Sequence, residues 1–309
     1  MLGIPYMGSK RKLAKPIIDY IVANNPKAVY FYDLFGGGGA ISFEALKRKQ
    51  FKKVFYNELN TGVCELLKKI RTDGVTPEFY KWVSREEFDT HKNDDTWYGG
   101  LLATCWSFGG NQRSYLFSAK IEEDKRLLHE VVVNKCKVAR TALKERTGLY
   151  IEDNYLEDTD IQKRRIKVMQ LVKAQIGRCD LQQLQQLEQL QQLQRLERLQ
   201  RLEQLEINNK SAFDFPIDTD PEETVIYLDP PYENTADYQE SLSHKELYAW
   251  IEKNSDFKIY LSSYASPLPL VAEFMHRSTL SATANNKVVE KLFCNKAEIN
   301  KQSLFGASE

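Results

Sequence analysis

Cysteine is scarce in this sequence, and its placement excludes several classes of protein. The 309 residues include five cysteines, an odd number, none of which forms a Cys-x-x-Cys pair; they stand at positions 64, 105, 136, 179 and 294. A disulfide framework uses an even set of cysteines, and zinc sites use closely spaced pairs. We therefore expect no disulfide and no metal, and a reducing cytoplasm, either bacterial or that of the host of a phage.

Long apolar runs and an excess of charge are missing as well. No stretch approaches the length that crosses a membrane, and the first residues lack the apolar segment of a secretion signal. The 43 basic and 43 acidic residues cancel, so a nucleic-acid partner must be met by a local basic patch. The sequence predicts a soluble intracellular protein without a membrane partner, long enough for one large domain or two modest ones.

A strand, a glycine loop, a helix and a second strand follow one another near the N-terminus. Residues 28–32 read as a strand and lead into Asp33 and a loop that contains Gly36–Gly39. A helix is predicted from about Ala40 to Leu46, and a second strand over residues 53–57. This order is typical of a βαβ nucleotide-binding unit, in which glycines let the backbone approach a ligand.

Glu58 follows the second strand, about twenty residues beyond the loop, where such folds hydrogen-bond ribose hydroxyls. The loop is not Gly-x-Gly-x-x-Gly, and no Gly-Lys-Ser/Thr follows it. Dinucleotides and nucleoside triphosphates therefore fit poorly, and a zwitterionic adenosine ligand without phosphates fits better. The alternative is a glycine-rich turn in a generic α/β protein.

The strongest chemical signal is the stretch Val225–Tyr232, read Val-Ile-Tyr-Leu-Asp-Pro-Pro-Tyr. Four apolar residues predict a buried strand, and two prolines force the chain out of the sheet in a stiff, extended form. Asp229 and Tyr232 then lie at the carboxyl edge of the sheet, where open α/β sheets bind ligands. The carboxylate and the Pro230 carbonyl can accept both hydrogens of an exocyclic amino group while Tyr232 stacks on its ring. An ordinary Asp-Pro turn is the alternative.

The middle of the chain has a different character. Residues 77–118 are rich in aromatic residues and are expected to be irregular, with amides and an arginine on a glycine turn. Asn and Gln can read adenine, Arg can read guanine or bind phosphate, and aromatic rings can enter a base stack. A basic helix is predicted over about 124–147, ending at Gly148. These features favour contact with DNA, although a loop closing a small hydrophobic cluster fits equally well.

Residues 181–206 form a low-complexity repeat with leucine at every third position. On an α-helix each leucine falls about 60° behind the last, so the apolar stripe winds around the helix and a two-stranded coiled coil is disfavoured. We expect a winding helix or a turn-by-turn repeat, with a structural or spacer use.

The sequence also predicts elements that carry no candidate catalytic residues. They are a helix after Ser9 that Pro16 kinks or delays, a helix over about 61–71 that packs on the sheet, strands over 205–207 and 258–262, a helix opened by the capping box Ser243–Glu246, and a closing hairpin over 278–283 and 287–294.

Three motifs in this order resemble the Dam-type DNA N6-adenine methyltransferases (D12 class, alpha group). They are the loop at 33–39 with Glu58, the tetrapeptide 229–232, and the opening segment Pro5–Lys10. The resemblance implies an α/β fold, with a Rossmann-like S-adenosylmethionine-dependent methyltransferase sheet, helices on both its faces, and a mainly helical target-recognition insertion. Residues 1–75 and 205–309 would be the catalytic domain, 76–178 the recognition region, and 179–206 a repeat insertion that departs from the family pattern.

The resemblance also implies roles for individual residues. Asp229, Pro230 and Tyr232 would hold a flipped adenine for direct, in-line methyl transfer. Double-stranded DNA would be met by Asn111, Gln112, Arg113, Tyr115 and Lys120. S-adenosylmethionine would contact residues from both ends of the chain, namely Tyr6, Met7, Lys10, Asp33, Phe35, Gly36, Gly37, Glu58, Leu59, Ala212, Phe213 and Asp229.

Other readings of the same motifs stay open. The tetrapeptide also suits N4-cytosine methylation, or methyl transfer to an RNA amino group or a protein amide, and a DNA-binding module that has lost activity is a non-enzyme alternative. We expect a monomer or a weak dimer.

Overall fold

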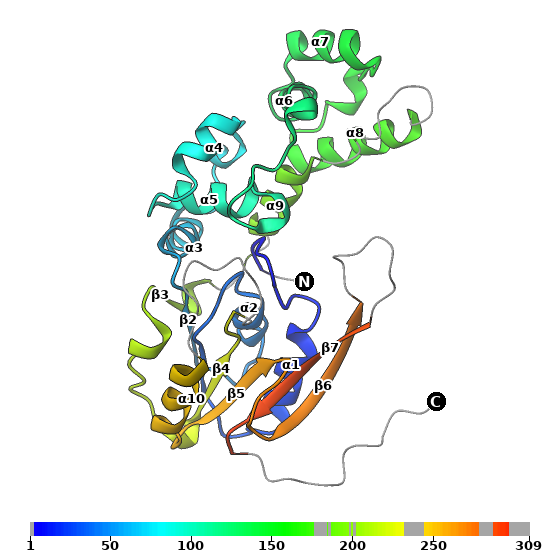
Figure 1. The fold of residues 1–309 in the computed structure, drawn as a ribbon. Helices are drawn as coiled ribbons and strands as arrows, with labels where there is room; N and C mark the ends of the chain where they lie inside the picture. The colour runs from blue at the N-terminus through cyan, green and yellow to red at the C-terminus, as the bar shows by residue number, and fades with distance from the viewer. Residues whose placement is uncertain are drawn as a thin grey trace, which may run out of the picture. The chain divides into compact units, whose positions relative to one another are not determined.

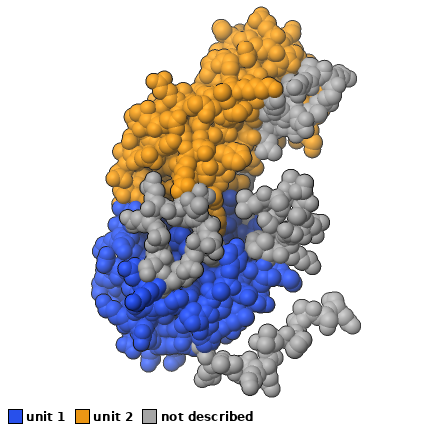
Figure 2. All heavy atoms as spheres, viewed as in Figure 1, with its two compact units in different colours: residues 1–3, 9–59, 201–309 blue, residues 4–8, 60–200 orange. Residues whose placement is uncertain are grey.

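The computed structural model describes residues 3–175, 184, 187–197, 199, 202–231, 244–277 and 287–296. Contacts divide the chain into two compact units, coloured separately in Figure 2. Unit 1 comprises residues 1–3, 9–59 and 201–309, and unit 2 comprises residues 4–8 and 60–200. In sequence, most of unit 2 is inserted between the second and third strands of unit 1.

Unit 1 contains a mixed sheet of seven strands among the described residues, in the order β3-β2-β1-β4-β5-β7-β6 (Figure 1). The strands β1 to β5 are parallel, whereas β7 runs antiparallel to β5 and β6 runs antiparallel to β7. Their bounds are β1 Tyr30–Asp33, β2 Lys53–Asn57, β3 Leu205–Asn208, β4 Thr224–Leu228, β5 Lys258–Ser263, β6 Leu270–Arg277 and β7 Lys287–Cys294.

Helices cover both faces of this sheet because its central strands are apolar on both sides. All five residues of β4 are buried. Ile226 and Leu228 pack with Trp250 of α10 (His244–Lys253) on one face. On the other face, Asn25, just after α1 (Ala14–Ala23), donates to the Tyr260 hydroxyl at 2.9 Å, and α2 (Ala40–Ala45) lies beside β1 and β2. The predicted Rossmann-like α/β sheet with helices on both faces is confirmed.

Most predicted elements of unit 1 are found, with one correction. The N-terminal helix begins at Ala14, the later start that was one of the two predicted effects of Pro16. Pro16 lies in the first turn, where its missing N–H has no helical partner to lose. The partner of β7 is β6 at 270–277, a strand that the sequence did not predict; residues 278–283 and Ser243 of the expected capping box lie outside the described residues.

Unit 2 is helical, with short 3₁₀ turns between helices. Its α-helices among the described residues are α3 Thr61–Asp73, α4 Arg85–His91, α5 Trp97–Cys105, α6 Ala119–Asn134, α7 Lys137–Thr147, α8 Ile161–Gln175 and α9 Glu188–Glu197. Within unit 2, the main contacts of α3 are with α5. A Cβ on Gly100 would lie 2.0 Å from the Gly62 carbonyl oxygen, so the two helices approach through paired glycines.

Two further predictions in unit 2 are corrected. The single helix expected over 124–147 is two helices, because Lys135 adopts φ 53° and Cys136 caps the start of α7. The segment 77–118, expected to be irregular, contains α4 and α5, and Ser84 and Thr96 accept backbone N–H groups as their N-caps. The predicted stop at Gly148 is confirmed.

The leucines of the repeat in and just before α9 belong to the core of unit 2. Within and just before α9, four leucines are at most 1% exposed: Leu187, Leu190, Leu193 and Leu196. With a spacing of three they fan over about half of the helix circumference, and α9 contacts both α5 and α8. The α-helix ends at Glu197, a 3₁₀ turn follows at Leu202–Gln204, and β3 begins at Leu205. The leucines of α9 therefore have a structural use in the core of unit 2, whereas residues from 201 onward belong to unit 1.

A polar contact fixes the repeat against α6. The imidazole of His129 is fully buried, with Nε2 2.9 Å from the Tyr80 carbonyl oxygen and Nδ1 3.1 Å from the Gln189 amide nitrogen. Nδ1 therefore accepts from Gln189, which requires a neutral ring that donates from Nε2. Burial lowers the pKa of His129 from 6.5 to about 4, although the Tyr80 carbonyl opposes the shift.

We expect unit 2 to lose stability in mild acid. The unfolded state binds this proton more readily than the folded state, so stability is full above about pH 6.5 and falls until about pH 4. The loss between about pH 7 and pH 5 amounts to about 2 kcal/mol. Urea unfolding followed by tryptophan fluorescence measures it, since the Trp82 and Trp106 rings lie against His129. His129→Gln should remove this share of the pH dependence; an unchanged pH profile in that variant would contradict the account.

Candidate active site

Asp33 and Asp229 stand at the ends of neighbouring parallel strands. Asp33 closes β1, Asp229 follows β4 directly, and β1 pairs with β4 so that Asp33 lies opposite Tyr227. Successive strands lead away from this pair in both directions, β2 and β3 on one side and β5 on the other (Figure 1). This is the switch point of an open α/β sheet, where ligands bind at the carboxyl edge.

The glycine loop is built against β2. The Gly36 N–H donates to the Asn57 carbonyl at 2.8 Å, and the Tyr56 hydroxyl donates to the Gly37 carbonyl at 2.7 Å. A Cβ on Gly36 would lie 2.2 Å from the Tyr56 ring, so this position excludes a side chain for a reason inside the protein. The sequence attributed all the loop glycines to the approach of a ligand; at Gly36 the approaching group is Tyr56.

Glu58 is tied to the same loop. Its carboxylate accepts the Gly37 N–H at 2.7 Å, and its side chain is mostly buried. The Asn209 amide donates to the carbonyl oxygens of Glu58 and Leu59, both at 2.8 Å. The acid is therefore held beside the loop from both backbone and side chain.

The Asp33 carboxyl group is almost fully buried, and one of its two oxygens has a hydrogen-bond partner among the described residues. Its Oδ2 accepts from the Ser42 hydroxyl of α2 at 2.6 Å, while Oδ1 has no hydrogen-bond partner among the described residues. Burial raises the pKa of Asp33 to about 7, the Ser42 bond opposes the shift, and the charges of Asp229 and Glu58 add to it. A buried acceptor without a partner is costly, and a cationic ligand would satisfy it.

Asp229 is paired with the ammonium group of Lys10. The Lys10 Nζ lies 2.8 Å from Asp229 Oδ1 and 3.5 Å from Oε1 of Glu290 on β7. Burial raises the pKa of Asp229 and the negative charge of Glu290 adds to it, although Lys10 opposes the shift. Burial alone would lower the pKa of Lys10, but the two carboxylates outweigh it and the pKa is raised. The sequence predicted Lys10 and Asp229 here and missed Glu290, which no local motif marks.

An aromatic wall stands at the same edge of unit 1. The rings of Phe35 and Phe213 meet edge to face with centroids 6.4 Å apart, and the Trp250 indole donates to the Phe213 carbonyl at 3.2 Å. Ala212 is buried in the neighbouring turn. Among the residues predicted for chemistry, Pro230 is buried and Tyr232 lies outside the described residues.

Three residues predicted for the cofactor have other surroundings within their own units. Tyr6 and Met7 belong to unit 2, where the Met7 N–H donates to the Gly110 carbonyl at 3.1 Å. Leu59 is the last residue of the segment 9–59 of unit 1, and it is 62% exposed.

The loop that follows Phe108 in unit 2 is held by its own amides. Asn111 Oδ1 accepts the N–H groups of Arg113 and Ser114, and Gln112, at φ 63°, accepts from the Asn60 side chain at 2.8 Å. Arg113 and Lys120 are exposed. Tyr115 is 7% exposed and its hydroxyl donates to the Val83 carbonyl at 2.7 Å, so it supports the loop from inside.

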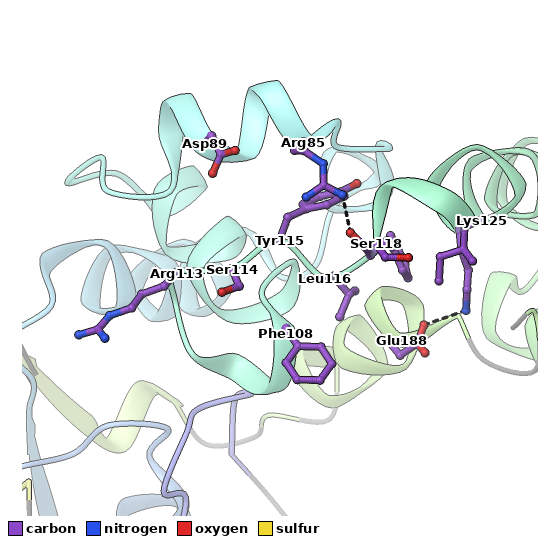
Figure 3. Close-up of a pocket in the computed structure, with 12 residues that line it drawn as sticks. Arg85, Asp89, Phe108, Arg113, Ser114, Tyr115, Leu116, Ser118, Lys125 and Glu188 are labelled. Carbon is purple, nitrogen blue, oxygen red and sulfur yellow. Dashed lines mark hydrogen bonds and ion pairs between the residues drawn. The ribbon is translucent and has the colours of Figure 1, made fainter. Parts of the chain in front are cut away.

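A hollow of about 670 Å³ adjoins this loop (Figure 3). The Arg85 guanidinium lies over the Tyr115 ring at 4.8 Å, and Lys125 pairs with Glu188 at 3.1 Å. Its lining includes Phe108 and Arg113, and none of the residues predicted for methyl transfer.

The described residues contain no group of three histidine, cysteine, aspartate or glutamate side chains arranged to hold a metal ion. Within the same residues, no helix combines the length and apolar character needed to span a membrane.

Comparison with known proteins gives one extensive match. A sequence model of the family described as D12 class N6 adenine-specific DNA methyltransferase matches residues 6–305. No curated protein matches the chain. Among solved structures, the chain is similar to the "Putative methyltransferase yhhF" of Escherichia coli, with 12% identity, a TM-score of 0.30, and coverage of 96% of this chain and 92% of that one.

Proposed function

The chain belongs to the D12 class N6 adenine-specific DNA methyltransferase family, and from this premise we propose that it methylates the N6 amino group of adenine at specific sites in double-stranded DNA. The methyl donor is S-adenosylmethionine, and the adenine is flipped out of the duplex to reach Asp229. The observation that carries the proposal is the position of Asp229 at the switch point of the sheet, beside Asp33 and the glycine loop.

The residues at this edge fit the donor. S-adenosylmethionine carries cationic groups, ribose hydroxyls and an adenine ring, and when bound it supplies a methyl group on a positively charged sulfur. Asp33 Oδ1 is a buried acceptor without a partner among the described residues, which suits a cationic group. Glu58 can accept from ribose hydroxyls, and Phe35 and Phe213 offer an aromatic wall for the adenine ring. Tyr6, Met7, Lys10, Gly37, Leu59 and Ala212 complete the proposed set.

The chemistry assigned to Asp229 follows from the amine. The lone pair of an aromatic amine is delocalised into the ring, so the nitrogen is a weak nucleophile. A carboxylate and the Pro230 carbonyl that accept both N–H groups favour a pyramidal nitrogen whose lone pair points away from them. The nitrogen then forms a bond to the methyl carbon as the carbon–sulfur bond of the donor breaks, with the electron pair left on the sulfur, and the nitrogen releases one proton to solvent. Positioning of the two reactants supplies much of the rate. Tyr232 is assigned to stack on the flipped ring.

DNA contact is proposed for the loop of unit 2 that carries Asn111, Gln112 and Arg113, with Lys120 on a phosphate. The amides of Asn111 and Gln112 are engaged in holding the loop, whereas Arg113 and Lys120 are exposed. The two cations are thus the first candidates for direct contact, and Tyr115 is assigned to support them.

We expect Arg113→Ala to weaken DNA binding by about 1–3 kcal/mol if the guanidinium reads a base, with relaxed sequence preference. If the guanidinium contacts only phosphate, binding weakens on all sequences. The slope of log affinity against log salt concentration then becomes shallower by about one unit, because about one fewer counterion is released. Fluorescence anisotropy at several salt concentrations separates these results. Lys68→Ala removes a positive charge elsewhere on unit 2 and is the control. Unchanged affinity in Arg113→Ala would remove this residue from the interface.

The proposal is tested by sequencing DNA from cells that express the protein and lack other adenine methylation. N6-methyladenine confined to one short sequence is expected. Unmodified adenine throughout, with the protein soluble and abundant, would contradict the proposed function.

A further inference from the structure

Glu290 is a buried carboxylate that none of the sequence motifs includes. Its side chain is 4% exposed and pairs with Lys10, which is 8% exposed and pairs in turn with Asp229, which is 17% exposed. Carboxylates are almost never this buried unless they are paired. Glu290 is therefore part of the charge balance around Asp229.

The antiparallel strand brings Glu290 to this edge. In register, Lys291 of β7 lies opposite Ser263, the last residue of β5. Because β7 runs against β5, residues near the start of β7 reach the carboxyl edge of the parallel strands. A parallel strand in the same place would have delivered its first residues to the opposite edge.

The ammonium group of Lys10 lies between two carboxylates at unequal distances. It is 2.8 Å from Asp229 Oδ1, with a hydrogen bond, and 3.5 Å from Glu290 Oε1. A buried ammonium that loses its carboxylate is strongly destabilised, so Lys10 leaves Asp229 only if another anion receives it. Glu290 is that anion, and a movement of less than an ångström makes it the nearer partner.

This geometry matters because Asp229 has competing donors. An oxygen that accepts from an ammonium has less electron density and fewer lone pairs for an incoming amino group. We propose that Glu290 is a positioning residue that receives the Lys10 ammonium when adenine reaches Asp229, and so releases the Asp229 carboxylate to accept the amino hydrogens. The inference rests on the proposed function.

The test uses Glu290→Gln, which keeps the shape of the side chain and removes its charge. Of the two carboxylates that flank Lys10, Asp229 alone then keeps its negative charge, so Lys10 stays on Asp229. At saturating cofactor and DNA, kcat should fall on the order of 10-fold or more. The Kd for S-adenosylmethionine should stay within about 2-fold, since the change acts on release of Asp229. Glu290→Asp retains the charge and should recover most of the rate.

Two comparisons make the result specific. Glu273→Gln removes an exposed carboxylate of β6, the other strand of the hairpin, and should leave kcat unchanged. In a Lys10→Met background, Glu290→Gln should produce no further loss, because Glu290 acts through Lys10. Circular dichroism and thermal unfolding of each variant show that the fold is intact.

The outcomes separate the inference from the function beneath it. If the wild-type protein methylates DNA adenine and Glu290→Gln is equally active, the inference alone is overturned. The same holds if Glu290→Gln lowers kcat as much in the Lys10→Met background as in the wild type. Wild-type protein that binds DNA but methylates no adenine would overturn both.

Discussion

Asp229→Ala is expected to abolish methyl transfer, with a loss of kcat of roughly 10³-fold or more, because the variant loses the acceptor for the amino group. Cofactor binding should persist, since Asp33, Glu58 and the aromatic wall are unchanged. Folding should persist as well, because Lys10 retains Glu290 at 3.5 Å as its counter-charge. Single-turnover transfer of labelled methyl groups to DNA, beside calorimetry with S-adenosylmethionine, measures both properties.

Asp229→Asn is the sharper companion to this variant. It keeps the volume of the side chain and one oxygen, but it replaces the other acceptor by an N–H₂ group that cannot accept. A rate between those of the wild type and Asp229→Ala is expected. Retained turnover in Asp229→Ala would refute the assigned role.

Glu58→Ala is expected to show the reverse pattern. The variant loses the proposed acceptor for ribose hydroxyls and should weaken S-adenosylmethionine binding by about 30–100-fold, the effect of losing hydrogen bonds to a charged group. Transfer at saturating cofactor should fall much less, because the amino-group acceptors stay in place. Isothermal calorimetry and the KM for the cofactor measure the first effect, and kcat the second.

Glu58→Gln separates a ligand contact from support of the loop. Its amide oxygen can still accept the Gly37 N–H, a bond of 2.7 Å in the structure, while its N–H₂ group cannot accept from a hydroxyl. If the ribose assignment holds, Glu58→Gln loses much of the affinity that Glu58→Ala loses. Full affinity in Glu58→Gln would show that the acid serves only the glycine loop.

The parallel core was predictable because its signals are local. Tyr30–Asp33, Lys53–Asn57 and Thr224–Leu228 are short apolar strands followed by acids, glycines or prolines, and the structure contains all three within a residue or two of the predicted bounds. The order of these strands and their terminal acids also places Asp33 and Asp229 at one edge. The family match across residues 6–305 agrees with the resemblance drawn from these motifs.

The elements that were not predicted differ in the reason for the miss. Helix α3 packs against α5 because Gly62 and Gly100 permit backbone contact, which no local pattern reveals. The start of α4 was readable, since Ser84 is followed three residues later by Glu87, the spacing of a capping box. The break at Lys135 was not, because it requires a left-handed residue that is not glycine.

The site shows the same division. Lys10, Asp33, Glu58 and Asp229 were found from motifs, and the structure gathers them in unit 1. Ser42 and Glu290 were missed, because their importance lies in hydrogen bonds and ion pairs formed across the sheet. The roles of all these residues in binding and catalysis are proposals that the variants above test.

One measurement tests the central claim directly. The purified protein is incubated with labelled S-adenosylmethionine and, separately, with double-stranded DNA or RNA, after which the nucleoside that carries the label is identified. The proposed function predicts label in N6-methyladenine from DNA, and none when Asp229→Ala replaces the wild type. Label in N4-methylcytosine, in RNA alone, or in no nucleoside would contradict it.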